Sequence, residues 1–302
     1  VLTQIGGKRV RLGTPEEYYA ASMGTRLLRE AVRRAGKPGM PINFDSQAMT
    51  EYAHSAILVP GGARLTDIWT YWTSYPVGIV RMVSLNRAAI SLEFGNPLFA
   101  AGAGSLYGYS GGPETAAIAL VADGIGVIML DNCGILQIGG ARPIVGPSGI
   151  PENFWTQGLA GLSVFRNIDG IIGGGSGGSK SGLCTEMQFY EIAVGRIRCE
   201  PQAAFTTGGA TGHGSEDDYI NGLTARWNVE LGKEIVGLSL TDANDMVKTL
   251  MMNPKYNLGN EPDGKRFQEV YDLETVTPRN EYLEMYQRMT REVKNLLGIN
   301  PK

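Results

Sequence analysis

Short apolar segments that read as buried strands alternate with helical segments along the first 215 residues. The strand-like segments are Met40–Phe44, Ala89–Phe94, Gly126–Leu130, Asp169–Gly173 and Ala203–Thr206. The helical segments are Thr14–Ala35, Ile68–Leu85, Thr115–Gly124, Ile150–Phe165 and Thr185–Cys199. Alternation of this kind is typical of parallel strands, since a chain that returns to the same edge of a sheet needs a crossover. The pattern therefore predicts an α/β fold, a parallel sheet with helical crossovers.

The number of units bears on the architecture. About five strand-helix units are more than a small doubly wound domain requires and fewer than the eight of a closed barrel. An incomplete TIM-like (β/α)8 barrel accounts for the count and for a chain that starts at Val1 in mid-pattern, through processing or a missing N-terminal part. The alternative is an open doubly wound sheet, but no strand is followed by a G-x-G-x-x-G or G-x-x-x-x-G-K-[ST] loop that opens a helix.

The chain reads as one domain in two parts. Residues 1–215 form the barrel portion with the active-site mouth, and residues 216–302 supply closing helices and a C-terminal extension. Leu2–Leu12 alternates around Gly6-Gly7 and predicts a small hairpin. The residues after Asp217 are helical and more charged, so we expect little core from them.

Composition excludes several classes of protein. The chain is 43% hydrophobic and only 19% charged with a net charge of -3, and no basic run suggests binding to nucleic acid or to an anionic membrane. We find no apolar run of transmembrane length. Three scattered cysteines, Cys133, Cys184 and Cys199, do not make a disulfide framework, and two histidines make a zinc site improbable. A reducing cytoplasm fits this composition.

Polar residues at the predicted strand ends are the candidates for chemistry. Glu93, Glu114 and Asp131 fall at or just after successive strands, and carboxylates there serve as general acids or bases when apolar surroundings raise their pKa. We expect the barrel mouth to be built from residues 43–54, beginning at Asn43, with 93–114, Asp131-Asn132 and 173–181. Alternatives stay open: a solvated loop at residues 45–55, a helix start at Glu114 and a turn or cap at Asp131-Asn132.

Other polar and aromatic residues have less specific interpretations. His54 and His213 fit hydrogen-bonded loop residues better than metal ligands, because no third ligand is evident. Trp69, Tyr71, Trp72 and Tyr75 have helical spacing, which favours packing over a cage for a cation. The 42 glycines gather in the runs 100–112 and 170–182, where we expect loops that approach backbone or ligand closely.

Several separate stretches resemble one enzyme family. In order they are Thr25-Arg26-Leu27, Ala35-Gly36-Lys37-Pro38-Gly39-Met40, Gly108-Tyr109-Ser110-Gly111-Gly112-Pro113-Glu114-Thr115, Cys184-Thr185-Glu186-Met187, and Gly264-Lys265-Arg266-Phe267-Gln268-Glu269-Val270-Tyr271-Asp272, with Thr275-Val276-Thr277-Pro278 and Glu281-Tyr282 after it. They are similar to the monomethylamine methyltransferases of methanogens. The resemblance implies a TIM-like barrel, of which this chain corresponds to roughly the C-terminal two thirds. It also implies methyl transfer from a methylated amine to the cobalt of a corrinoid (cobalamin) on a small partner protein, no tightly bound cofactor, and a homo-oligomer, a hexamer by resemblance.

The chain departs from this family at the centre of the site. Members with the activity carry pyrrolysine in the loop after the strand that follows Pro-Gly-Met, and ungapped counting between Pro38 and Gly62 places that position at Tyr52. Pyrrolysine has an electrophilic imine that adds an amine, whereas tyrosine has no electrophile. The glycine-serine run 173–181 also stands where the family has polar pocket residues.

Two functions therefore remain open. The first is a corrinoid-dependent methyltransferase without pyrrolysine, with Glu114 and Tyr52 as catalytic residues and Glu93, Asn43, Tyr107, Asp131 and Asn132 binding the substrate. Its methyl donor would arrive activated, as a quaternary ammonium does, held by Glu114 and by aromatic faces such as Tyr52 and Tyr107. The second is a barrel-fold binding or assembly subunit that has lost methyl transfer.

Overall fold

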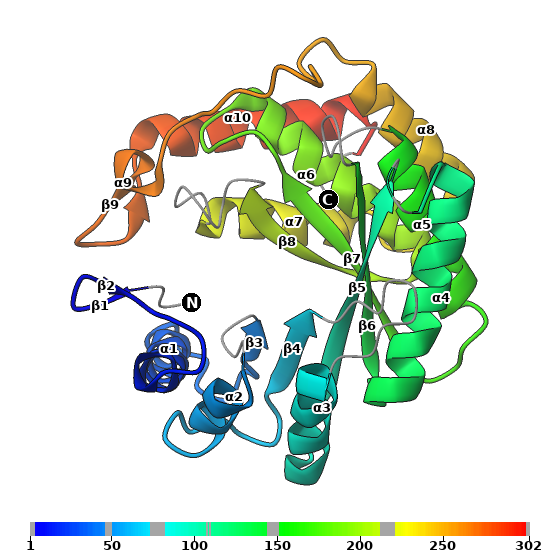
Figure 1. Cartoon of the computed structure of the whole chain (residues 1–302). Coiled ribbons are helices and arrows are strands. Elements are labelled where there is room, and N and C mark those ends of the chain that lie inside the picture. Colours follow the sequence, from blue (N-terminus) through cyan, green and yellow to red (C-terminus); the bar gives the residue numbers. More distant parts are fainter. Residues whose placement is uncertain are drawn as a thin grey trace. The chain divides into compact units, whose positions relative to one another are not determined.

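The computed structural model of this protein describes residues 4–45, 50–72, 82–106, 108, 110–143, 151–211 and 221–299. Within them, six strands form one sheet in the order in which they occur in the sequence (Figure 1). The strands are β3 (Asn43–Asp45), β4 (Ile68–Trp72), β5 (Leu98–Leu106), β6 (Ile135–Pro143), β7 (Ile172–Ser179) and β8 (Phe205–Thr211). The β3–β4, β4–β5 and β7–β8 pairs are parallel, with Asn43 opposite Ile68, Trp69 opposite Leu98 and Gly174 opposite Phe205. The predicted α/β fold with a parallel sheet is confirmed.

Helices connect the strands and follow the sheet. The helices between strands and before the sheet are α1 (Pro15–Arg34), α2 (Glu51–Leu58), α3 (Met82–Phe94), α4 (Pro113–Asp131), α5 (Pro151–Phe165) and α6 (Glu186–Cys199), with a 3-10 turn at Glu200–Gln202. After β8 come α7 (Gly222–Glu234), α8 (Leu240–Met251), α9 (Phe267–Val270) and α10 (Asn280–Leu296). Two small hairpins complete the described elements: β1 (Gln4–Ile5) with β2 (Lys8–Arg9), as predicted, and β9 (Tyr271–Asp272) with β10 (Thr277–Pro278).

Helix-start chemistry places several of these helices correctly from the sequence. Pro15 opens α1 with Glu16 and Glu17 in its first turn, and Pro151 opens α5 with Glu152 behind it. A proline at the first position costs no hydrogen bond, and a carboxylate beside it is stabilised by the positive end of the helix dipole. The predicted helices at 14–35, 150–165 and 185–199 are therefore confirmed to within a residue or so.

Three predictions from apolar periodicity are wrong. Residues 68–85 were expected to be helical, but residues 68–72 form β4, which places Trp69, Tyr71 and Trp72 in a strand. Of the described residues in this range only 82–85 lie in a helix, and Tyr75 lies outside the described residues. Residues 89–94 were expected to be a strand and lie in α3, and the expected strand 126–130 lies inside α4. Short apolar runs fit a buried helix and a buried strand equally well. This ambiguity explains why two helical segments were predicted as strands and one strand as a helix. β6 was missed altogether.

Large parts of the glycine-rich runs are strands, where we expected loops. Residues 98–106 form β5 and residues 172–179 form β7. A Cβ atom on Gly173 would lie 2.6 Å from the Phe165 ring, and one on Gly175 would lie 2.4 Å from Cys199 Sγ. Glycine in β7 therefore lets the ends of α5 and α6 pack directly on the strand backbone.

The chain forms two compact units. One comprises residues 1–103, 122–137 and 170–172, and the other residues 104–121, 138–169 and 173–302. The core of the second unit includes the fully buried side chains of Tyr190, Trp227 and Tyr282, and Trp227 Nε1 donates to the Phe189 carbonyl over 3.1 Å. Because α10 supplies Tyr282, Met289 and Val293 to this core, the expectation that the charged C-terminal helices contribute little core is wrong.

One described helix passes a length and composition test for crossing a membrane, although we expected none. It is α4, which has 19 residues, a mean hydropathy of 1.6 over its best window and 28% of that window buried. The same apolar residues produced the wrong strand prediction at 126–130. Since α4 connects β5 to β6, its apolar character also fits a crossover helix.

Asp67 should be a main determinant of stability in the first unit. Its fully buried carboxylate accepts hydrogen bonds from Ile42 N (2.9 Å) and Arg64 N (2.8 Å) and pairs with Arg29. Asp67→Ala leaves the partly buried guanidinium without this carboxylate, so we expect the free energy of unfolding in urea to fall by about 3 kcal/mol or more. Glu30→Ala removes the exposed partner of Arg33 and Arg34 and should stay close to wild type. Equal losses in the two variants would contradict this assignment.

Candidate functional site

The carboxyl ends of β3, β5 and β7 lead into loops that carry polar side chains. Parallel α/β proteins place their chemistry at this end of the strands. The described residues there are 50–52 after β3, 108 and 110–114 after β5, and 180–185 after β7. Tyr107, His213 and the loop residues 46–49, which the sequence also placed in or near the site, lie outside the described residues.

Tyr52 stands in the first turn of α2 with an accessible ring. Thr50 caps the start of the helix. Its Oγ1 accepts from Ala53 N over 3.4 Å and donates to Glu17 Oε2 over 2.9 Å. Glu17 also accepts from Gly13 N, so the start of α2 is tied to the start of α1. The Tyr52 side chain is 60% exposed and its carbonyl accepts from Ser55 Oγ. A ring in this position is free to contact a ligand.

Glu114 is the second residue of α4, directly after Pro113. The turn before it contains Gly111 at φ +69, where a Cβ would lie 2.7 Å from Thr115 Oγ1. The Glu114 side chain is exposed, so it lacks the apolar surroundings expected of a general acid or base at this position. The helix-start interpretation of its position is confirmed. None of the described residues donates a hydrogen bond to its carboxylate. Both oxygens are therefore accessible for a cation, and the catalytic role of Glu114 stays a prediction.

Glu93, Asp131 and Asn132 lie at the wrong ends of their elements for the predicted mouth. Glu93 is exposed in the last turn of α3, ahead of β5, and Asp131 is the buried last residue of α4, ahead of β6. Asn132 follows at φ +49, and its N–H donates to the Ile128 carbonyl over 3.1 Å, a left-handed helix cap. The cap alternative is thus confirmed for this pair. Asn43 opens β3 instead of following it, with an exposed side chain.

His54 is a structural residue between two helices. Its ring is buried in α2, and Nε2 lies 3.3 Å from Ser91 Oγ on α3. Burial, and then the positive charge of Arg87, lowers the pKa of His54 to about 2. A histidine that is neutral throughout the physiological range does not act as a general acid near pH 7, and the described residues contain no cluster of three metal-ligating side chains.

The loop after β7 contains the residues that sequence reasoning missed. Glu191, from the second turn of α6, is 3% exposed, and its two carboxylate oxygens accept the backbone N–H groups of Lys180 and Ser181. Lys180 Nζ lies 3.4 Å from Glu261 Oε2. A glutamate inside the apolar run Phe189–Val194 was the available signal, because a charge on the buried side of a helix requires partners.

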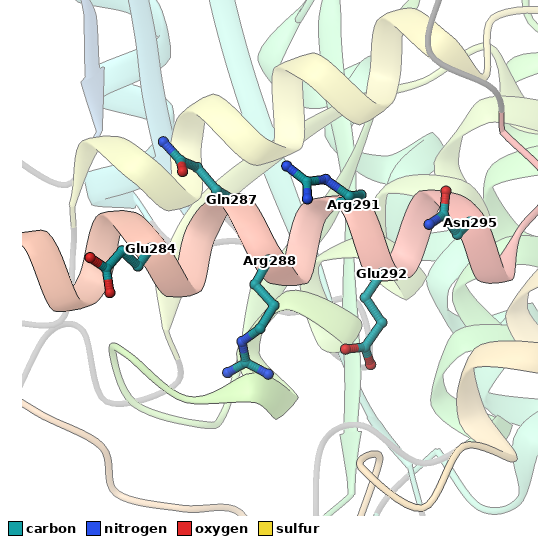
Figure 2. A pocket seen from close by; sticks show the side chains of 6 residues that line it. All are labelled: Glu284, Gln287, Arg288, Arg291, Glu292 and Asn295. Atoms are coloured by element: carbon teal, nitrogen blue, oxygen red, sulfur yellow. The ribbon is translucent and has the colours of Figure 1, made fainter.

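A cavity on the described part of the chain does not mark the site. Figure 2 shows that its lining residues, Glu284, Gln287, Arg288, Arg291, Glu292 and Asn295, all come from α10. Its volume of about 560 Å³ lies among the side chains of that single helix. Most of these side chains are exposed, so the cavity is a surface depression. Because α10 also follows the last strand of the six-stranded sheet by many residues, the cavity carries no part of the catalytic assignment.

Acid should destabilise the protein through His54. Its pKa in the folded chain is below the unfolded value of about 6.5, so protons bind preferentially to the unfolded chain. The stability contributed by neutral His54 is complete above pH 6.5 and falls as the pH drops toward 2, by at most about 1.4 kcal/mol per pH unit. Urea unfolding at pH 7.5 and 5.5 should show a smaller decrease for His54→Gln than for wild type. An NMR titration of His54 with a midpoint near 6.5 would contradict the assignment.

Comparison with known proteins identifies the family to which the chain is similar. The sequence profile of the family described as monomethylamine methyltransferase MtmB matches residues 1–298. Monomethylamine methyltransferase MtmB1 of Methanosarcina barkeri and MtmB of Methanosarcina mazei are each 26% identical over 309 aligned residues, which cover 98% of this chain and 64% of the relative. The chain thus spans somewhat less than two thirds of the length of these relatives.

Solved structures of the same family share the fold of this chain. The crystal structure of the Methanosarcina barkeri enzyme superposes with a TM-score of 0.90 at 24% identity, over 99% of this chain and 65% of that chain. A crystal structure of a hydroxylamine complex of MtmB gives the same TM-score, identity and coverage. With a profile match along nearly the whole sequence, the chain belongs to the monomethylamine methyltransferase MtmB family.

Proposed function

We propose that this chain provides the catalytic part of a methyltransferase that moves a methyl group from a methylated amine to a corrinoid on a partner protein. The observation that carries the proposal is the family match over residues 1–298. The six-stranded sheet supports it as part of a TIM-like (β/α)8 barrel, with the site at the carboxyl ends of the strands. The corrinoid accepts the methyl group at its cobalt.

Exposure of the two leading candidates fits a corrinoid that arrives on another protein. Tyr52 is 60% exposed and the Glu114 side chain is also exposed, so each is accessible to a donor brought against a partner-borne group. In the proposal Glu114 anchors the positive charge of the amine and Tyr52 offers an aromatic face to it. Tyr107 stays in the proposed substrate site. Asn43, Glu93, Asp131 and Asn132 leave it, because Asn43 opens β3 and the other three precede strands.

The methyl donor follows from what Tyr52 lacks. A neutral amine is a poor leaving group unless it is protonated or covalently activated, and tyrosine has no electrophile with which to activate it. A quaternary ammonium already departs as a neutral amine. Contact of such a cation with an aromatic face contributes about 0.5 to 2 kcal/mol when desolvated. The donor that this site supports best is therefore a quaternary ammonium.

The assembly and location of the protein follow the same proposal. Trp155 and Leu159 are one turn apart on α5 with exposures of 47% and 37%, and apolar side chains in that arrangement support a homo-oligomer. A monomeric mass by light scattering would count against the oligomer.

Three buried free cysteines, Cys133, Cys184 and Cys199, support a reducing compartment such as the cytoplasm.

The alternative function is a barrel-fold binding or assembly subunit without catalysis. The feature that favours it is Tyr52, to which ungapped counting between Pro38 and Gly62 assigns the position of the family's imine. Failure to associate with any reduced corrinoid protein, in a pull-down with purified components, would favour this alternative over methyl transfer.

Glu114→Gln should separate a substrate anchor from a helix-start carboxylate. Loss of the charge removes the electrostatic hold on a cationic donor, so we expect kcat/KM to fall by a factor of about 100 or more. The melting temperature should change little because the side chain is exposed. Glu152→Gln is the matched control, since Glu152 is also exposed and also follows the proline that opens its helix. Equal effects in the two variants would assign Glu114 to the helix start alone.

A donor panel tests the leaving-group argument. Methyl transfer to a reduced corrinoid protein should be faster from quaternary amines than from monomethylamine, for the reason given above. Mass spectrometry of the peptide containing position 52 must accompany the assay. Robust turnover of monomethylamine by protein shown to carry tyrosine there would refute the proposed donor class.

A further inference from the structure

The turn of residues 180–185 is the best-defined described segment at the carboxyl end of a strand. It begins where β7 ends at Ser179 and leads into α6, which starts at Glu186 (Figure 1). Ser179 Oγ donates to the Ser181 carbonyl over 3.2 Å, so the turn is also held to the last residue of the strand. Side chains in this position face the region where α/β proteins bind substrates.

Glu191, on α6, holds the turn of residues 180–185 through two charge-assisted hydrogen bonds. Lys180 N donates to Oε1 over 3.1 Å, and Ser181 N donates to Oε2 over 3.0 Å. The carboxylate is 3% exposed, and its hydrogen bonds satisfy two backbone N–H groups at once. Both oxygens are therefore engaged with the turn, and Glu191 is not available to bind a substrate itself.

Residues 259–265 hold the same turn from a second side. Gly182 N donates to the Pro262 carbonyl and Lys265 N donates to the Leu183 carbonyl, each over 2.9 Å. A Cβ on Gly182 would lie 1.6 Å from the Asp263 carbonyl oxygen, so the two backbones are in direct contact. Cys184 completes the turn at φ +60, a conformation that a non-glycine residue keeps only when its surroundings impose it.

From this geometry we propose that Glu191 is a positioning residue, which fixes the turn after β7 as a rigid wall of the methyl-transfer site. The inference rests on the proposed function and assigns a role to a residue that touches neither donor nor acceptor. Catalysis needs reacting groups held to within a fraction of an ångström, and a displacement of about 1 Å can cost a factor of about 100 in rate. A turn with hydrogen bonds on two sides and a strained residue within it meets this requirement.

The charge state of Glu191 connects the turn to pH. The titratable groups around it are Lys180, Glu261 and Tyr256, from the turn and from the segments packed against it. Burial raises the pKa of Glu191, with a smaller contribution from the negative charge of Glu261, while the hydrogen bonds from Ser181 and Lys180 act in the opposite direction. Protonation replaces one acceptor oxygen by a hydroxyl and weakens one of the two bonds to the turn. Methyl transfer should then lose rate as the pH falls through this ionisation.

Glu191→Gln is the variant that tests the role. Its amide nitrogen cannot accept, so one of the two turn N–H groups loses its partner. We expect hydrogen exchange at the Lys180 and Ser181 amides to accelerate at least 10-fold and kcat/KM to fall at least 10-fold. The variant should also lack the acidic limb of the wild-type rate profile.

Tyr286→Phe is the matched control. It removes the 2.6 Å hydrogen bond from a buried tyrosine to Glu230 in the same unit, away from the turn. We expect a similar loss of melting temperature, with unchanged exchange at the two turn amides and an unchanged pH profile. A merely structural Glu191 would behave like this control.

The outcomes separate the inference from the proposed function. If wild type transfers methyl groups and Glu191→Gln does so with the same kcat/KM and pH profile, the positioning role is overturned. If wild type transfers no methyl group from any amine, the proposed function fails and amide exchange decides alone. Exchange at Lys180 and Ser181 equal to wild type would then overturn the role of Glu191, and selective acceleration would retain it as the residue that fixes the turn.

Discussion

Parallel pairing of neighbouring strands forces the chain to travel from the carboxyl end of one strand to the amino end of the next before it can pair again. In this protein a helix makes that return where the described residues follow it without a gap, as α6 does between the parallel strands β7 and β8. The position of a residue within such a connection therefore decides at which end of the strands it lies. Residues after a strand lie at its carboxyl end, and residues at the end of a crossover helix lie before the next strand. The functional meaning of a carboxylate depends on which of these two places it occupies.

The position of each carboxylate before or after a strand explains which candidate site residues remain at the carboxyl end of the sheet. The type of each element decided the outcome. Glu114 does follow a strand, although that strand is β5 and not the expected 89–94. Asp131 ends a helix that the sequence led us to divide into a helix and a strand. Gly126–Leu130 contains Val127 and Ile128, which favour strands, but the run continues an apolar helix of 19 residues. The long apolar helix around these residues outweighed their own preference for a strand. Proline and carboxylate signals at Pro15 and Pro151 were reliable because they act on the helix start directly.

Close packing accounts for the other errors. Glycine runs at 100–112 and 170–182 suggested loops, because glycine is costly in a strand interior. In β7 close packing offsets the free-energy cost of glycine in a strand. The Phe165 ring and Cys199 Sγ occupy the space that side chains on Gly173 and Gly175 would fill. A neighbour that is distant in sequence creates this requirement. No pattern local to the strand could have predicted it.

The same distinction between local and distant partners separates the two glutamates of greatest interest. Glu191 was missed because its partners, the amides of Lys180 and Ser181, are ten and more residues away across a turn. Those partners use both of its oxygens, so its charge serves the backbone. Glu114 was found from its neighbours in sequence, and among the described residues nothing donates to its exposed carboxylate. A cationic donor needs the second kind of carboxylate for attraction, and a site of fixed shape needs the first kind to hold its wall. Glu114 lies in the first turn of the helix after β5, and Glu191 supports the turn after β7 from the second turn of α6. The two carboxylates thus fill the two different roles that the proposed methyl transfer from a charged amine requires.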